Sequence, residues 1–153
     1  MTPVPTNPHK ILIADDDREH LLMLAFLLRK AGYQVISAFD AKHALQLAVE
    51  QAPDLLLLDI HLGDEDGYEV HERLQKIDEL AQVPVIYLTG DSSNWVQTIT
   101  TALGAHAVIR KPFNSDELLA VIRAGLKKLE VVPPVEVPRP VIPACESTDA
   151  YVG

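Results

Sequence analysis

Hydrophobic residues gather in five short runs, and longer stretches of mixed polarity separate them. Each run is five or six residues long, a length typical of a β-strand that is buried on both faces. The predicted strands cover residues 10–14, 33–38, 54–59, 83–88 and 105–109. The third is the most distinctive, because four consecutive leucines stand between Asp54 and Asp59.

Between and after these runs, apolar residues recur every three or four positions, which is the spacing of one helix face. The inward positions of five predicted helices are Leu21, Leu24, Ala25 and Leu28; Ala44, Leu45 and Ala48; Val70, Leu74 and Ile77; Val96, Ile99 and Leu103; and Leu118, Ile122, Leu126 and Leu129. Asp40 is a predicted N-cap, and Asn114 with Glu117 is a predicted capping box. Alternating strands and helices predict an α/β fold, with a doubly wound parallel sheet and right-handed crossovers.

Composition indicates an ordinary globular protein. The 153 residues are 48% hydrophobic and 23% charged, and they suit a single domain. We expect a loose leader over residues 1–9, the folded domain over 10–130, and a Pro-rich tail or linker over 131–153. The net charge of −9 argues against direct nucleic acid binding, and the single cysteine excludes an internal disulfide. No secretory signal and no apolar run of membrane-spanning length are present, so we expect a cytoplasmic protein.

Charged and hydroxyl side chains follow four of the predicted strands. Asp15 and Asp16 follow the first, Asp59 ends the third, Thr89 follows the fourth and Lys111 follows the fifth. The carboxyl ends of parallel strands meet at one edge of a sheet, so these five residues are expected to converge there.

This set of residues suits phosphoryl transfer. Clustered carboxylates repel one another unless a cation compensates, and hard oxygen ligands favour Mg²⁺. Asp59 would be the nucleophile, Lys111 would neutralise a phosphoryl oxygen and Thr89 would donate a hydrogen bond. Taken singly, each residue is more often a helix cap, a turn residue or a surface lysine; the combination favours function.

These motifs resemble the receiver domain of two-component response regulators. The resemblance rests on the acidic opening Ile11 to Asp17, on Asp59 with Gly67 eight residues later, on Thr89-Gly90 and on Lys111-Pro112-Phe113. It implies a flavodoxin-like sheet with strand order 2-1-3-4-5 over roughly residues 10–130.

The resemblance also implies a role for each site residue. Asp59 is the expected phosphorylation site. Asp16 and Asp59 would bind Mg²⁺ directly, Asp15 through a water molecule and His61 through its backbone carbonyl. Lys111 would contact the phosphoryl group and precede a cis proline, and Thr89 would reorient on activation.

The partners implied by the resemblance are a histidine kinase or a histidine phosphotransfer protein. A homodimer or partner face is expected on the fourth helix, fifth strand and fifth helix, where Trp95, Thr98, Ala102 and Lys127 are candidates. The sequence contains no helix-turn-helix region and no second catalytic domain. The output therefore lies either with partner proteins or with a further domain beyond the Pro-rich segment.

Three features depart from the family pattern. Gly63 stands where a proline is usual, so we expect a more flexible loop after Asp59. Val108 stands where an aromatic switch residue is common, so movement of Thr89 would reach the output surface by another route. His61 and Asp91 occupy variable positions that tune phosphoryl lifetime in the family.

Three other functions are compatible with parts of this pattern. A haloacid-dehalogenase-like phosphatase also uses an aspartate nucleophile, but it needs a second aspartate where His61 stands. A flavodoxin-type binding module would need a phosphate-cradling loop after the first strand, where this chain has Asp15, Asp16 and Asp17. A degenerate receiver used only as an interaction surface is disfavoured, because all five key positions are intact.

Overall fold

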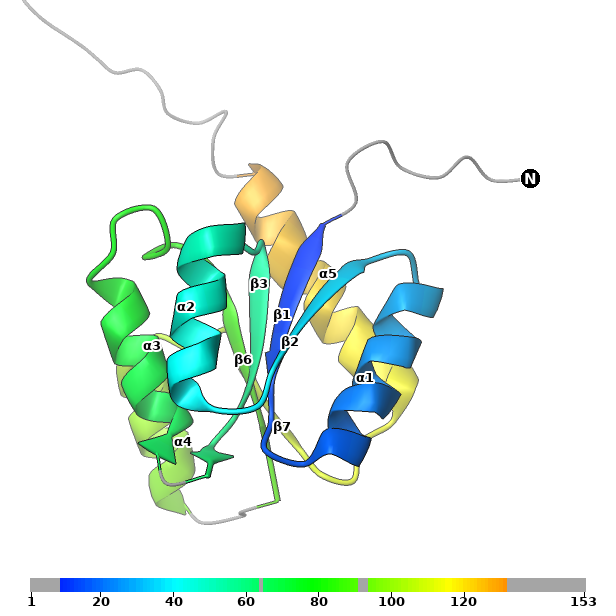
Figure 1. The fold of residues 1–153 in the computed structure, drawn as a ribbon, viewed down its shortest axis with the longest axis horizontal. Helices are drawn as coiled ribbons and strands as arrows, with labels where there is room; N and C mark the ends of the chain where they lie inside the picture. The colour runs from blue at the N-terminus through cyan, green and yellow to red at the C-terminus, as the bar shows by residue number, and fades with distance from the viewer. Residues whose placement is uncertain (1–8, 64, 91–93, 132–153) are drawn as a thin grey trace, which may run out of the picture.

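The computed structural model describes residues 9–63, 65–90 and 94–131, and these form one sheet with helices on both faces (Figure 1). The five strands are all parallel and lie in the order β2-β1-β3-β6-β7. Their bounds are β1 Lys10–Ala14, β2 Gln34–Ala38, β3 Leu55–Asp59, β6 Val85–Thr89 and β7 Ala107–Arg110. The predicted fold class and strand order are confirmed.

Five helices cover the sheet, and they divide between its two faces. They are α1 Arg18–Lys30, α2 Ala41–Gln51, α3 Gly67–Gln75, α4 Asn94–Ala102 and α5 Ser115–Val131. Buried residues of α2, α3 and α4 pack together on one face, and those of α1 and α5 pack on the other. The fold therefore has three layers and two separate hydrophobic cores.

The leucine run in β3 joins these two cores. Leu56 and Leu58 face the core under α2 and α3, whereas Leu55 and Leu57 face the core under α1 and α5. Each is at most 1% exposed, and burying one leucine side chain contributes about 1.5–3 kcal/mol. The central strand is thus held from both sides, and it fixes the position of Asp59 at its end.

Polar caps set where the helices begin. Asp40 accepts a hydrogen bond from the backbone N–H of His43, as predicted for an N-cap. The Asn114 side chain accepts from the N–H groups of Asp116 and Glu117, which agrees with the capping role expected of Asn114. Both caps satisfy donors that the first helical turn leaves free.

The segment after Asp59, which was expected to be a loop, has regular structure. It forms a two-stranded antiparallel hairpin of β4 (His61–Leu62) and β5 (Glu65–Asp66). Leu62 is 1% exposed and joins the hydrophobic core, which anchors the hairpin. Gly63 has a φ of 68°, a left-handed conformation that a glycine adopts without strain.

Gly67 is the first residue of α3. A Cβ atom at this position would lie 2.3 Å from the backbone oxygen of Asp59, closer than any real side chain approaches. Glycine is therefore required here by the close packing of α3 on the end of β3, and this contact helps to fix the Asp59 backbone.

Several predicted strand boundaries shift by one or two residues. The second, fourth and fifth strands begin at Gln34, Val85 and Ala107, because the preceding residues belong to half-buried connections. Ile77 packs on the core from beyond the end of α3. The predicted inward position of Leu129 lies outside the described side chains, as do most of the leader and the tail.

No helix in the described ranges has the length and apolar character needed to cross a bilayer.

Candidate functional site

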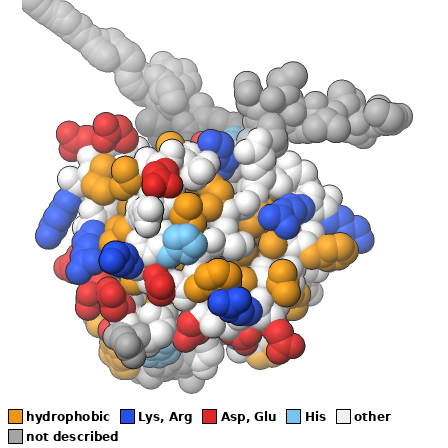
Figure 2. Space-filling view, in the orientation of Figure 1, with side chains coloured by type: hydrophobic (Ala, Val, Ile, Leu, Met, Phe, Trp, Pro, Cys, Tyr) orange, Lys and Arg blue, Asp and Glu red, His pale blue; other side chains and the backbone are white. Residues whose placement is uncertain are grey.

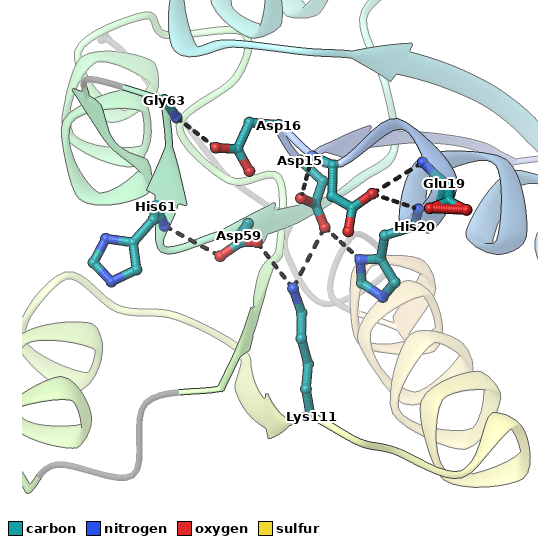
Figure 3. A network of polar contacts seen from close by, with 9 residues as sticks. Asp15, Asp16, Glu19, His20, Asp59, His61, Gly63 and Lys111 are labelled. Atoms are coloured by element: carbon teal, nitrogen blue, oxygen red, sulfur yellow. Dashed lines mark hydrogen bonds and ion pairs between the residues drawn. The ribbon is translucent and has the colours of Figure 1, made fainter.

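Four of the predicted site residues come together at the edge of the sheet where the strands end (Figure 3). Asp15 and Asp16 follow β1, Asp59 ends β3 and Lys111 follows β7. Asp15, Asp16 and Asp59 each offer a carboxylate oxygen, and these three oxygens all lie within 4.8 Å of one another. Parallel strands bring their carboxyl ends to one edge, which explains the convergence.

Lys111 connects the first and third strands of the chain. Its Nζ atom lies 2.9 Å from Oδ2 of Asp59 and 3.4 Å from Oδ2 of Asp15. The Lys111 side chain is 28% exposed, whereas those of Asp15 and Asp59 are only 3% and 13% exposed. One ammonium group therefore faces two nearly buried carboxylates, which leaves the cluster negatively charged.

The pKa values of these three groups shift in different directions. Burial raises the pKa of Asp59, and the hydrogen bonds from Lys111 and the His61 N–H only partly oppose this effect. Burial also acts to raise the pKa of Asp15, but hydrogen bonds from His20 and the Asp17 N–H, with the charge of Lys111, outweigh it, so that pKa is lowered. Burial acts to lower the pKa of Lys111, but its contacts with Asp59 and Asp15 prevail and raise it.

The β4–β5 hairpin closes one side of the site. The backbone N–H of Gly63 donates to Oδ2 of Asp16 at 3.2 Å, and that of His61 donates to Oδ1 of Asp59 at 3.1 Å. The His61 side chain is 66% exposed, and its Nδ1 lies 3.7 Å from Oδ1 of Asp66. The role expected of the His61 carbonyl oxygen stays a prediction.

Thr89 ends β6, next to the residue that pairs with Asp59. It is 1% exposed, and its carbonyl oxygen accepts a hydrogen bond of 2.7 Å from the backbone N–H of Lys111. The Lys111–Pro112 peptide bond is cis, as the resemblance implied. Val108 is half-buried and pairs with the buried Tyr87 of the neighbouring strand.

His20 belongs to this site although the sequence reasoning did not identify it. Its Nδ1 atom is hydrogen-bonded to Oδ2 of Asp15, and its ring lies 6.0 Å from that of Phe113. Asp17 caps α1 by accepting from the N–H groups of Glu19 and His20, which places the first helical turn beside the strand end. The sequence held one signal for His20: it lies in the first turn of a helix that begins directly after the three aspartates.

The residues present fit a divalent cation of the Mg²⁺ type. Three carboxylates from two strands supply hard oxygen donors, and Asp16 is exposed, so a cation could keep part of its water shell. The single ammonium group of Lys111 does not balance three carboxylates, so the charge of the cluster also favours a cation.

Comparison with known proteins places the chain in one family. The family described as "Response regulator receiver domain" matches residues 11–123. A CheY-like receiver domain protein from Methanospirillum hungatei is 32% identical, with a TM-score of 0.76, and the match covers 81% of this chain and 98% of that one. The chemotaxis protein CheY4 of Vibrio cholerae is 28% identical, with a TM-score of 0.75, over 78% and 100% of the two chains.

A third similar structure is the signal receiver domain of a signal transduction histidine kinase from Syntrophus aciditrophicus. It is 25% identical, with a TM-score of 0.74, and the match covers 84% of this chain and 98% of that one. The family match spans most of the described residues and includes Asp15, Asp16, Asp59 and Lys111. It favours the receiver over the phosphatase and flavodoxin-type alternatives. The chain therefore belongs to the receiver domain family of two-component response regulators.

Proposed function

We propose that Asp59 accepts a phosphoryl group and that this modification switches the contacts of the protein with its partners. The observation that carries the proposal is the position of Asp59 at the end of β3, 2.9 Å from the Lys111 ammonium group and beside the carboxylates of Asp15 and Asp16. A carboxylate held next to a cation and a metal-binding cluster is the arrangement that phosphoryl transfer to aspartate requires.

In this reaction an oxygen of Asp59 attacks the phosphorus of a phosphohistidine. The phosphorus–nitrogen bond breaks, the imidazole leaves and takes up a proton, and Asp59 becomes an acyl phosphate. Lys111 neutralises charge on a phosphoryl oxygen. Thr89, buried at the end of the strand beside Asp59, would reorient its hydroxyl toward the phosphoryl group and donate a hydrogen bond. Asp15, Asp16 and Asp59 would hold Mg²⁺, with the His61 carbonyl as a further ligand, and the bound ion would neutralise phosphoryl charge.

The protein acts in this proposal as a stoichiometric acceptor and not as an enzyme that turns over a pool of substrate. The phosphoryl group would shift a pre-existing equilibrium between two conformations. Val108 lacks an aromatic ring, so the change at Thr89 would spread through β6, where Tyr87 packs against Tyr68 with ring centroids 5.6 Å apart.

The proposed partners of this cytoplasmic protein are a histidine kinase or a histidine phosphotransfer protein. The occurrence of a similar receiver domain within a signal transduction histidine kinase supports this assignment. A homodimer or partner contact is proposed on the face made by α4, β7 and α5. Trp95 is 48% exposed there and contacts Tyr68 edge to face, while Thr98, Ala102 and Lys127 are also exposed.

The proposal is tested by incubating the protein with acetyl phosphate and Mg²⁺ and measuring its intact mass. We expect a gain of one phosphoryl group that hydroxylamine removes, because hydroxylamine cleaves acyl phosphates. Asp59→Asn should lose this gain, and Asp78→Asn, which changes an exposed carboxylate elsewhere, should keep it.

Two results would contradict the proposal. Labelling that persists in Asp59→Asn would place the acceptor at another residue. If acetyl phosphate gives no label, beryllofluoride with Mg²⁺ is titrated while Trp95 fluorescence is recorded, since this phosphoryl mimic needs no donor protein. No response in either experiment would mean that the domain serves only as an interaction surface.

A further inference from the structure

The outer face of α1 carries an exposed apolar surface that the phosphoacceptor site does not use. Leu22 and Phe26 are 71% and 69% exposed, and Phe39, just after β2, is 39% exposed. Leu22 lines two adjoining hollows, one shared with Phe39 and the other with Phe26. We call Leu22, Phe26 and Phe39 the α1 patch. Large exposed apolar residues grouped in this way usually mark a contact surface.

Basic side chains border the α1 patch. The Arg18 guanidinium lies 4.4 Å from the centre of the Phe39 ring, and the Lys30 ammonium lies 6.0 Å from that of Phe26. Arg29 lines both hollows. Figure 2 shows hydrophobic and basic side chains next to one another over the part of the molecule where α1 lies. The surface therefore suits a segment that is apolar and carries negative charge.

α5 shares with α1 the layer that covers one face of the sheet. Both helices pack on the same face of the sheet and end at the edge where the strands begin (Figure 1). A small hollow is lined by Arg123, Leu126 and Lys127 of α5 together with Tyr33, which follows α1 by three residues. The chain that continues after Val131 therefore starts on the same face of the sheet as α1, and Arg123 and Lys127 are further basic residues on that face.

Residues 132–153 have the composition that this surface suits. Prolines stand at 133, 134, 138, 140 and 143 with Val and Ile between them, and Glu136, Glu146 and Asp149 outnumber the one basic residue, Arg139. Pro-rich segments adopt an extended helix that docks on aromatic surfaces with little loss of entropy. These 22 residues would extend to about 68 Å, against about 20 Å for the 13 residues of α1, so their length is sufficient.

We propose that residues 132–153 dock in cis on the α1 patch, with prolines and aliphatic side chains on Leu22, Phe26 and Phe39. The acidic residues of the segment face Arg18, Arg29 and Lys30. A second copy of the chain fits less well, because a symmetric contact through α1 would place two sets of these three cations in one interface. The contact goes beyond the proposed function and does not depend on phosphorylation, and it controls how much of the patch is open to other proteins.

The only cysteine, Cys145, lies inside the segment and allows a direct test in the full chain. A nitroxide spin label on Cys145 is combined with ¹⁵N labelling, and amide signals are compared before and after the nitroxide is reduced. We expect the signals of α1 between Leu22 and Lys30 to lose most of their intensity in the oxidised sample. Those of α3, on the other face of the sheet, should keep theirs.

Variants separate docking from mere proximity. Phe26→Ser removes an aromatic side chain of the patch at an exposed position and should restore the α1 signals. Val49→Ser, which removes an apolar side chain of 59% exposure from α2, should leave the broadening unchanged. Broadening that survives Phe26→Ser, or that spreads evenly over the molecule, would overturn the proposal.

Contact between molecules is distinguished by mixing two samples. Spin-labelled protein without ¹⁵N is added to ¹⁵N-labelled protein carrying Cys145→Ser. We expect no broadening of the α1 signals in this mixture. Broadening of the same strength as in the singly labelled chain would show that the segment docks on a second copy, which would overturn docking in cis.

Discussion

Three consecutive aspartates after β1 have three different roles. Asp15 is buried and contacts His20 and Lys111, whereas Asp16 is exposed and accepts a hydrogen bond from Gly63. Asp17 faces neither the lysine nor the hairpin and caps α1 instead. Residue type is the same at all three positions, so burial and hydrogen-bond partners decide what each carboxylate does.

Asp59→Asn is expected to stabilise the protein when no divalent cation is present. Burial raises the pKa of Asp59, so the folded state favours the protonated carboxyl group. The contribution of this protonated group to stability is complete below pH 3.8 and is lost as pH rises through the pKa of the folded state. At neutral pH the charged carboxylate therefore costs folding free energy, which the amide avoids. Thermal unfolding at pH 7 in EDTA should show a melting temperature a few degrees higher.

Asp78→Asn is the control for this change, because Asp78 is exposed and lies outside the site. It should leave the melting temperature within the error of the wild-type value. A lower melting temperature for Asp59→Asn would mean that the ion pair with Lys111 outweighs the cost of burying the carboxylate.

At the scale of elements, a buried polar contact joins α3 to the sheet. His71 on α3 is 3% exposed, and its Nδ1 atom lies 2.9 Å from the hydroxyl oxygen of Tyr87 on β6. Its Nε2 atom lies 3.3 Å from Nε2 of Gln75. Burial lowers the pKa of His71 because the protonated ring loses its hydration. The packing of α3 therefore favours the neutral imidazole.

The stability of the protein should fall as pH decreases below 6.5, the usual pKa of a histidine, because unfolding lets His71 take up a proton. The contribution of neutral His71 to stability is complete above pH 6.5, and it is lost as pH falls through the lowered pKa that His71 has in the folded state. His71→Gln keeps a hydrogen-bonding side chain that does not titrate, so its melting temperature should vary less between about pH 5 and 7. His61→Gln, at an exposed position, should keep the wild-type pH profile; an equal flattening in both variants would exclude His71 as the cause.

At the scale of the whole molecule, charge is distributed unevenly relative to the sheet. The net charge is −9, and three carboxylates meet at the edge where the strands end. Arg29 and Lys30 in the last turn of α1, and Arg123 and Lys127 of α5, lie toward the opposite edge, where the strands begin. The two surfaces therefore attract ligands of opposite charge.

Mg²⁺ is expected to raise the melting temperature of the wild-type protein, and EDTA should reverse the effect. A ligand at a hundred times its dissociation constant adds about 2.7 kcal/mol to the free energy of unfolding. Asp16→Asn should weaken this effect because it removes an exposed ligand of the cluster. Asp17→Asn is a matched control at the next position, since asparagine caps a helix as well as aspartate does. Equal losses in the two variants would place the cation outside the predicted site.

Much of this arrangement could be predicted from the sequence. The leucine run of β3 reads as a strand buried on both faces, and the alternation of strands with helices requires a parallel sheet. Once the sheet is parallel, Asp15, Asp59 and Lys111 must meet at one edge, so local patterns were enough to predict their convergence. The strand order itself came from the family resemblance and not from the hydrophobic pattern.

The hairpin, the contact of His20 and the need for Gly67 could not be predicted from the local hydrophobic pattern, because each depends on how the elements pack. The β4–β5 hairpin has strands of two residues, too short for a periodic signal, and its anchor Leu62 is one apolar residue in a polar stretch. His20 contacts Asp15 only because of the angle at which α1 leaves the strand end. The requirement for Gly67 arises from the close approach of α3 to the Asp59 backbone oxygen.

The contact between Lys111 and Asp15 joins residues that are 96 positions apart. A ribosome synthesises the carboxylates of Asp15, Asp16 and Asp59 well before it adds the lysine that faces them. Contacts between such distant residues form late in folding, because the intervening chain must be ordered first. An incomplete nascent chain therefore cannot assemble this cluster, which is complete only when the sheet has been extended through β7 and Lys111 has been added.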